Sequence, residues 1–138
     1  MSLSVDEKME IAEVLNRAAY GYDERDLEMI RACYHPAASM SIQIAGGDLM
    51  GPFEGRDTVM KLFTDSMAAQ NDVRRHDVSN LFFLQSDEEI KAVSNLTLFA
   101  TEEGQTKLLT TGVYRDTMVV HDGRWVIMHR HLDLDSGY

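Results

Sequence analysis

The first part of the chain places apolar residues at steps of three and four, the spacing of an amphipathic helix. The helix is expected to begin at Ser4-Val5-Asp6-Glu7, a capping box in which the Ser hydroxyl and the Glu carboxylate each satisfy a free backbone N–H. Its apolar stripe consists of Val5, Met9, Ala12, Leu15, Ala19 and Tyr22. A short second helix is predicted over 26–34, stopped by His35-Pro36, and a third over 56–70.

From residue 38 the pattern changes to strict alternation, which predicts a half-buried strand over 38–44. A short strand is expected around 49–53, where Gly51-Pro52 is typical of a sheet edge. Four long strands follow, over 73–84, 90–102, 106–120 and 124–134, separated by short turns. Strands joined in this way are antiparallel neighbours. The sequence therefore indicates an α+β fold with three N-terminal helices packed on one face of a mainly antiparallel sheet.

Composition and charge narrow the range of functions. The 138 residues, 44% of them apolar, suit a single domain over 1–138. A formal charge of −10 would repel a phosphate backbone, so no nucleic-acid partner is expected. No apolar run approaches the roughly 20 residues that cross a bilayer, and residues 1–10 lack a signal-peptide core, so we expect a cytoplasmic protein without a membrane partner. The single cysteine, Cys33, excludes a disulfide framework and a multi-cysteine zinc site.

Histidines are the first candidates for chemistry. His76 lies in a predicted strand, and alternation places it on one face with Val78, Asn80 and Phe82. A histidine among apolar neighbours is either held by a backbone carbonyl or used as a general base near neutral pH. His35 and His121, beside a proline and in a turn, are expected in solvent.

The last strand has two faces, and a cavity can use only one of them. One face carries Val126, Met128, Arg130 and Leu132, and the other carries Trp125, Ile127, His129 and His131. The two histidines could ligate a metal, but only Asp133 and Asp135 at the strand end could complete the site, so no metal is expected. Arg130, among apolar residues, is either a salt-bridge partner in the core or an anion clamp.

Several short motifs together resemble the SnoaL-like branch of the NTF2-like family of cone-shaped α+β barrels. In chain order they are Tyr22-Asp23-Glu24-Arg25-Asp26, Gly51-Pro52-Phe53-Glu54-Gly55, His76, Gly112-Val113-Tyr114-Arg115-Asp116, and Asp122-Gly123-Arg124-Trp125 with Arg130. Each motif is weak singly, but their order and spacing are fairly specific. The resemblance covers essentially the whole chain and implies a curved sheet.

Within this family the chain is most similar to scytalone dehydratase and the lindane dehydrochlorinase. In such enzymes a helix-borne Asp orients a strand-borne His, which removes a proton while a leaving group departs. The matching positions are Asp23 and His76. Arg130, five residues after Trp125, matches an arginine of the dehydrochlorinase pattern, and this favours the Arg130 face of the last strand. Catalytic roles are therefore expected for Asp23, His76 and Arg130.

The resemblance also implies which residues contact the substrate. Those expected to do so are Tyr22, Tyr114, Met40, Asn80 and Leu132. Two departures separate the chain from its models, because the dehydrochlorinase lysine is Ala18 here and the second dehydratase histidine has no counterpart near Tyr114. The exact reaction is therefore left open between elimination, isomerisation and cyclisation.

The function implied is a dehydratase-like lyase or isomerase that needs no cofactor and acts on a small cyclic or aromatic-like molecule. Three alternatives share the scaffold: the small β subunit of a ring-hydroxylating dioxygenase, a ligand-binding module and a polyketide cyclase. A homodimer or homotrimer is also expected, because alternation puts Trp125, Ile127, Leu81 and Phe83 on the outer face of the sheet, too apolar a surface for a monomer.

Overall fold

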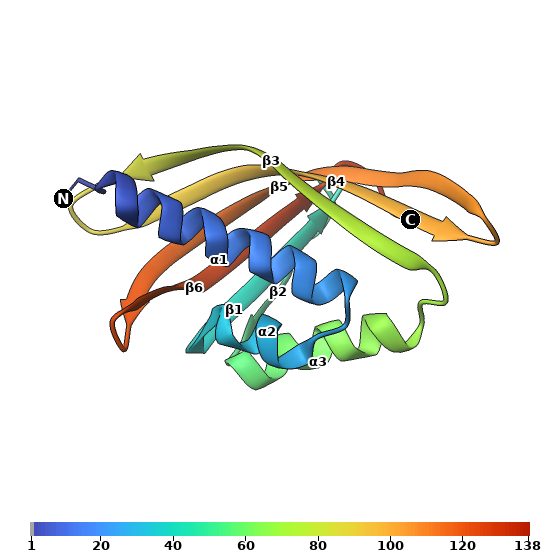
Figure 1. Ribbon diagram of the computed structural model, residues 1–138, viewed down its shortest axis with the longest axis horizontal. Helices are drawn as coiled ribbons and strands as arrows, with labels where there is room; N and C mark the ends of the chain where they lie inside the picture. The colour runs from blue at the N-terminus through green and yellow to red at the C-terminus, as the bar shows by residue number, and fades with distance from the viewer. Residues whose placement is uncertain (1) are drawn as a thin grey trace.

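The computed structural model describes residues 2–138 and confirms the predicted α+β architecture (Figure 1). Within these residues three helices, α1 (Val5–Asp23), α2 (Leu27–Ala32) and α3 (Arg56–Ala68), gather on one side of a curved six-stranded sheet. The strands are β1 (Tyr34–Ile44), β2 (Met50–Glu54), β3 (Val73–Gln85), β4 (Ile90–Glu102), β5 (Gln105–His121) and β6 (Arg124–Leu134). Their order is β2-β1-β6-β5-β4-β3, and every neighbouring pair is antiparallel except β1 with β6.

The helix starts follow the local sequence. At α1 the Glu7 N–H donates to Ser4 Oγ and the Ser4 N–H donates to Glu7 Oε1, both at 3.1 Å, so the expected capping box forms. At α2 the Asp26 carboxylate accepts the Met29 N–H at 3.1 Å. The Asp26 cap starts α2 directly after the turn that ends α1.

The second helix is shorter than predicted, because the chain turns extended before Pro36. Tyr34 already belongs to β1 and pairs with Ile127 of β6, and the Ile127 N–H donates to the Cys33 carbonyl at 2.8 Å. A residue before proline avoids the helical region, which favours this early start of the strand at His35. The sequence alone does not show that β1 will find a parallel partner at the far end of the chain.

The buried face of α1 is rotated relative to the expected stripe. Val5 and Met9 are 73% and 67% exposed, whereas Ile11, Leu15 and Ala18 are buried. The buried face is the one that packs on α2, β3 and β6. The same spacing carried back from Ile11 reaches Lys8 and Ser4 rather than the apolar residues of the first turn.

A bulge in β3 reverses its alternation. Ser79 pairs with Asn95 and Phe82 with Val93, so two residues of β3 face one of β4 between these pairs. Asn80, at the bulge, has a φ of 55° and is exposed. The face shared by His76 and Val78 therefore continues through Leu81, and the expected placement of Asn80 and Phe82 beside His76 is wrong.

A second bulge, at Met128 of β6, has the same effect. Thr117 pairs with His129 and Met118 with Ile127, which leaves Met128 without an opposite residue. Because of this bulge, Ile127 and Arg130 both face the helices, although strict alternation puts them on opposite faces. His129 and His131 lie on the outer face, where they contact serines of β1.

The prediction of an apolar outer face is also wrong, because the bulges in β3 and β6 turn its residues inward. Trp125 and Ile127 are 5% and 0% exposed in the main core, and Leu81 and Phe83 pack against that core. The residues offered as a dimer or trimer interface are thus used inside one chain. Self-association stays a prediction without this support, and light scattering of the purified protein at micromolar concentration tests it.

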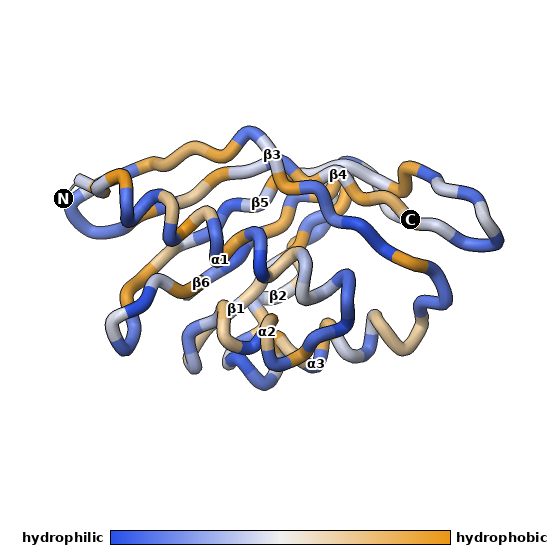
Figure 2. The backbone as a smooth tube through the Cα atoms, in the orientation of Figure 1, coloured by the Kyte–Doolittle hydropathy of each residue, from blue (hydrophilic) through white to orange (hydrophobic). Residues whose placement is uncertain are grey.

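The hydropathy of β3 marks where the core ends and the polar site begins. Figure 2 shows a largely hydrophilic first half of β3, around His76, and a hydrophobic second half beside the start of α1. The helix α1 packs on β3 and β6, while α3 packs on β1. The end of α1 therefore reaches the polar half of β3, opposite α3.

Candidate functional site

A cavity of about 130 Å³ lies between the helices and the inner face of the sheet. Every element except β2 and β4 contributes to its wall, and so does the segment after β6. Most lining residues are apolar. The polar ones are Tyr22, Tyr34, Ser66, His76, Tyr114, Arg130 and Tyr138. An apolar chamber with a few convergent polar groups is the usual form of a small-molecule site.

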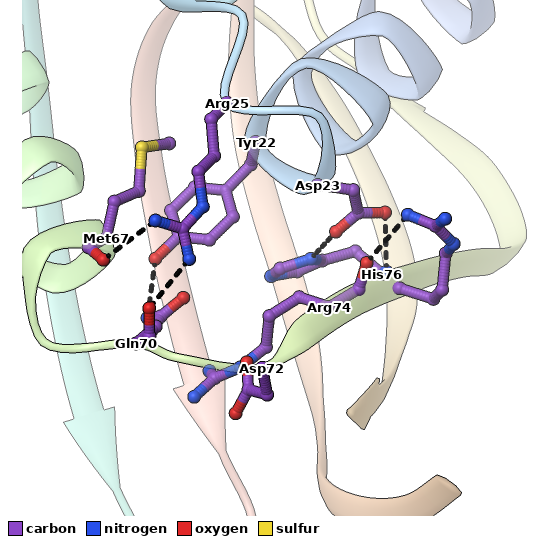
Figure 3. A network of polar contacts seen from close by, with 9 residues as sticks. Tyr22, Asp23, Arg25, Met67, Gln70, Asp72, Arg74 and His76 are labelled. Atoms are coloured by element: carbon purple, nitrogen blue, oxygen red, sulfur yellow. Dashed lines mark hydrogen bonds and ion pairs between the residues drawn. The ribbon is translucent and has the colours of Figure 1, made fainter. Parts of the chain in front are cut away.

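Asp23, at the end of α1, holds His76 of β3 by two contacts. Its Oδ1 lies 2.5 Å from His76 Nδ1, and its Oδ2 accepts the His76 backbone N–H at 2.9 Å (Figure 3). The side chains of His76 and Asp23 are only 11% and 6% exposed. An ionised Asp23 fixes the hydrogen on Nδ1, so Nε2 of this cavity-lining ring is free to take a proton.

Tyr22 stands beside this pair. Its ring makes an edge contact with the His76 ring at 4.9 Å between centroids and a second with Phe63 of α3. Its hydroxyl accepts a hydrogen bond from Gln70 Nε2 at 2.9 Å, which leaves the phenolic hydrogen free to donate elsewhere. Burial raises the pKa of Tyr22, so the phenol stays protonated at neutral pH.

Arg25, just after α1, links the end of α1 to the end of α3. Its Nη1 donates to the Met67 carbonyl at 3.2 Å and its Nη2 donates to the Gln70 carbonyl at 2.8 Å. These carbonyls lie at the C-terminal end of α3, where backbone acceptors lack helical partners and a cation is favourable. Figure 3 shows Arg25, Tyr22 and Gln70 joined in one network beside the Asp23–His76 pair.

Arg130 lines another part of the cavity and is paired with Asp116 of β5. Nε and Nη2 of Arg130 donate to Oδ1 and Oδ2 of Asp116 at 2.7 and 2.9 Å. The guanidinium also lies 3.9 Å from the centroid of the Tyr114 ring. Burial alone would lower the pKa of Arg130, but the neighbouring Asp116 raises it well above the usual value. The sequence left two roles open for Arg130, and the structure identifies it as a salt-bridge partner.

Tyr34 is a site residue that the sequence did not single out. Its side chain is 2% exposed and lines the cavity next to Arg130. Burial raises the pKa of Tyr34 to about 12, although the Arg130 charge opposes this rise. The only sequence signal for Tyr34 is an aromatic residue in front of His35-Pro36, where the pattern predicts the end of a helix.

Tyr138 was also missed, because it follows the last predicted strand. It lines the cavity while 64% exposed, so it lies at the side of the cavity that faces solvent. The Arg74 guanidinium lies 5.2 Å from the centroid of its ring, and Asp72 accepts a hydrogen bond from Arg74 Nε at 2.7 Å. Thr110 binds the Ser136 carbonyl at 2.8 Å and so anchors the segment leading to Tyr138.

The structure brings most of the predicted site residues together. His76, Tyr22, Arg130, Tyr114, Met40 and Leu132 all line the cavity. Asp23 reaches it through His76, whereas Asn80 does not line it. His129 and His131 lie on the opposite face of the sheet, and in residues 2–138 no group of three or more His, Cys, Asp or Glu side chains is placed to hold a metal ion.

The chain belongs to the SnoaL-like domain family, which matches residues 4–131. No curated protein matches the chain. Many solved structures match the fold of this chain.

Three solved structures illustrate the likeness in fold. An NTF2-like protein with a cystatin-like fold from Novosphingobium aromaticivorans is 17% identical, with a TM-score of 0.79 over 97% of this chain and 85% of that one. A protein from Catenulispora acidiphila in complex with S-DNPA is 19% identical, with a TM-score of 0.80 over 96% of both chains. A candidate scytalone dehydratase from Novosphingobium aromaticivorans is 22% identical, with a TM-score of 0.74 over 94% and 85%. The expected NTF2-like fold is thereby confirmed.

Across the part of the chain that the structure describes, no helix is long and apolar enough to pass through a membrane.

Proposed function

We propose that the protein is a dehydratase-like lyase or isomerase that uses its own side chains for acid/base catalysis on a small cyclic or aromatic-like substrate. The observation that carries this proposal is the Asp23–His76 pair, 2.5 Å apart, with the histidine in the wall of an otherwise mostly apolar cavity. The candidate scytalone dehydratase among the structural neighbours is consistent with it.

In the proposed reaction, His76 Nε2 removes a proton from a carbon next to a substrate carbonyl. The electron pair of the broken C–H bond moves toward that carbonyl, whose oxygen becomes negatively charged. Asp23 favours the imidazolium that forms, because its carboxylate accepts the Nδ1 hydrogen. Proton transfer by a positioned base of this kind contributes about 10²–10⁴-fold in rate.

The second half of the reaction expels a leaving group or moves the double bond. In an elimination the enolate electrons form the C=C bond as the C–O bond to a hydroxyl breaks, and one proton leaves with that hydroxyl as water. The His76 imidazolium returns its proton either to this oxygen or, in an isomerisation, to another carbon. Tyr22, Tyr34 and the free N–H groups of Arg130 are the donors that would stabilise the oxyanion.

Hydrogen–deuterium exchange tests the first step without knowledge of the natural substrate. The protein in D₂O is mixed with cyclic ketones such as 1-tetralone, and loss of the proton signal next to the carbonyl is followed by NMR. We expect His76→Ala to slow the exchange by about 10²–10⁴-fold relative to the native protein. The matched control is His129→Ala, which removes a histidine on the outer face of the sheet and should leave the rate unchanged.

Two outcomes would count against catalysis. If ketones bind in the cavity and no exchange occurs above the rate in buffer, the protein is better described as a ligand-binding module. If His76→Ala exchanges as fast as the native protein, His76 is not the base.

A further inference from the structure

We propose that Asp116 makes the cavity selective for uncharged ligands that carry a hydrogen-bond acceptor and against carboxylates. The inference concerns the same cavity as the proposed function and rests on that function only for the identity of the site. Asp116 acts through Arg130 and is thus a positioning residue rather than a catalytic one.

Arg130 is the only lining residue of the described chain with a permanent charge, and that charge is already neutralised. Both oxygens of Asp116 accept hydrogen bonds from it, at 2.7 and 2.9 Å, in the parallel two-bond geometry that carboxylates prefer with arginine. Asp116 is 0% exposed and Arg130 5% exposed, so solvent screens the pair little. An incoming carboxylate would therefore meet a guanidinium whose charge Asp116 already balances.

The pair arises from the register of the sheet. Asp116 and Arg130 are directly opposite each other on β5 and β6, so their side chains meet without distortion of either strand. The bulge at Met128 lies between Ile127 and Arg130, so both residues face inward. Asp116 thus occupies the Nε/Nη2 edge of the guanidinium, one of its two edges with parallel donors.

Carboxylates also pair with other basic side chains near the cavity. His76 is paired with Asp23, and Arg74 beneath Tyr138 is paired with Asp72. When His76 is neutral, as a base must be, Asp23 leaves this part of the site with a negative charge. A carboxylate would therefore lose its hydration and meet like charge in the same step.

The same side of the cavity offers hydrogen-bond donors to uncharged ligands. Arg130 has five N–H groups and Asp116 accepts from two nitrogens, so further N–H donors stay available. Tyr34 and Tyr114 are kept as neutral phenols, because burial raises the pKa of both. A ketone, amide or phenol oxygen can accept from such donors without bringing a second negative charge toward Asp116.

A pair of isosteric ligands tests the inference, since 2-naphthamide and 2-naphthoate have the same shape and differ in charge. Their dissociation constants for the native protein are measured at pH 7.5 by ligand-observed NMR. We expect the amide to bind at least about tenfold more tightly than the carboxylate, the minimum effect of like-charge juxtaposition in a buried site. Equal binding, or tighter binding of the carboxylate, would overturn the proposal without any variant.

The variant Asp116→Asn then assigns the selectivity to one residue. It keeps the shape of the side chain and removes its charge, so we expect naphthoate to gain about tenfold or more in affinity while naphthamide changes less than about threefold. A change of both ligands by the same factor would show a structural defect instead and would overturn the role of Asp116. Circular dichroism confirms that the variant is folded before binding is measured.

The same two strands provide a matched control. Arg115 Nε donates to Asp133 Oδ2 at 3.0 Å on the outer face of the sheet, and neither side chain of this Arg–Asp pair lines the cavity. Asp133→Asn should leave the ratio of the two dissociation constants unchanged. An Asp133→Asn variant that shifts the ratio as Asp116→Asn does would point to net charge rather than to the buried pair.

The failure of this inference and the failure of the proposed function are distinguishable. His76→Ala should abolish ketone exchange yet keep the preference for naphthamide, because the Asp116–Arg130 pair is untouched. Selectivity without exchange in the native protein would support the role of Asp116 and contradict catalysis. Exchange without selectivity would support catalysis and contradict the role of Asp116.

Discussion

Asp23 binds His76 at two points, one on the imidazole and one on the backbone of the same residue. The 2.9 Å bond to the backbone N–H fixes the carboxylate against β3, and the 2.5 Å contact then fixes the ring. One short side chain thereby sets both the position and the tautomer of the histidine. Asp23 thus has two roles: its bond to the backbone N–H holds β3 in place, and its contact with the imidazole acts on the charge and tautomer of His76.

The first prediction separates these two roles. Asp23→Asn can still accept the backbone N–H through its amide oxygen, so we expect a folded protein whose exchange or elimination rate falls by about 10⁴-fold, as when the orienting carboxylate of a Ser-His-Asp triad becomes Asn. His76→Ala should cost a similar factor, and the double variant little more, because the residues act as one unit. Losses that simply add in free energy would contradict a dyad.

The second prediction concerns Arg25, which holds the end of α3 against the end of α1. Arg25→Met keeps most of the side-chain length and removes both hydrogen bonds, at 3.2 and 2.8 Å, to the Met67 and Gln70 carbonyls. We expect the free energy of unfolding in urea to fall by about 1 kcal/mol. Turnover should fall more than substrate affinity, because Gln70 also positions the Tyr22 hydroxyl.

The control for Arg25 is another arginine of the same helical region. Arg17 pairs with Glu13 at 3.1 Å, but these side chains are 55% and 70% exposed, and such surface pairs contribute little. Arg17→Met should therefore leave both stability and turnover close to native values. If both arginine variants behave alike, the contact of Arg25 with α3 does not position the site.

Much of the fold followed from the sequence because its signals are local. The capping box at Ser4, the alternation in β1 and the short turns between the long strands each depend on neighbouring residues. The pairing of Asp23 with His76 was expected in another way, from the resemblance to the SnoaL-like family rather than from a local signal. The NTF2-like fold and the edge position of β2 agree with those expectations.

The remainder depends on contacts between residues far apart. The bulges at Asn80 and Met128 each insert one residue into a long alternating strand, and no local composition marks them. They decide that Leu81 faces inward and that both Ile127 and Arg130 do so. The Asp116–Arg130 pair, hidden until the register of β5 with β6 is known, could not be predicted either.

The third prediction concerns stability at mildly acidic pH. Burial, together with the nearby His131, lowers the pKa of His129, while Asp116 opposes this and Lys91 adds to it. A histidine whose pKa is lower in the folded state binds its proton more readily when unfolded. Its contribution to stability is therefore complete above about pH 6.5, the unfolded value, and is lost as the pH falls below it.

Urea unfolding at pH 8.0 and pH 5.5 measures this effect. His129→Gln should unfold with a smaller loss of stability between the two pH values than the native protein does. The comparison removes the shared contribution of all other titrating groups. A variant with the same or a larger loss on acidification would show that His129 is not responsible.

The fourth prediction tests the energetics of the buried pair. Arg130→Met leaves Asp116 as an uncompensated charge in a fully buried position, so we expect a loss of about 3–5 kcal/mol in the free energy of unfolding. Arg130→Lys should also be damaging, since a lysine cannot reproduce the two parallel bonds at 2.7 and 2.9 Å. The double variant Arg130→Met with Asp116→Leu removes both charges and replaces them with apolar groups, which in other buried pairs has been neutral or stabilising.

The double variant should thus be more stable than Arg130→Met alone, although it lacks one more native contact. That ordering follows because the main cost of the single change is the stranded carboxylate rather than the lost attraction. Chemical denaturation of the three variants measures it directly. A double variant less stable than Arg130→Met would show that the stranded carboxylate is not the main cost of the single change. If the double variant is as stable as the native protein, the Asp116–Arg130 pair is not needed for stability. That result would fit its proposed role in ligand selection.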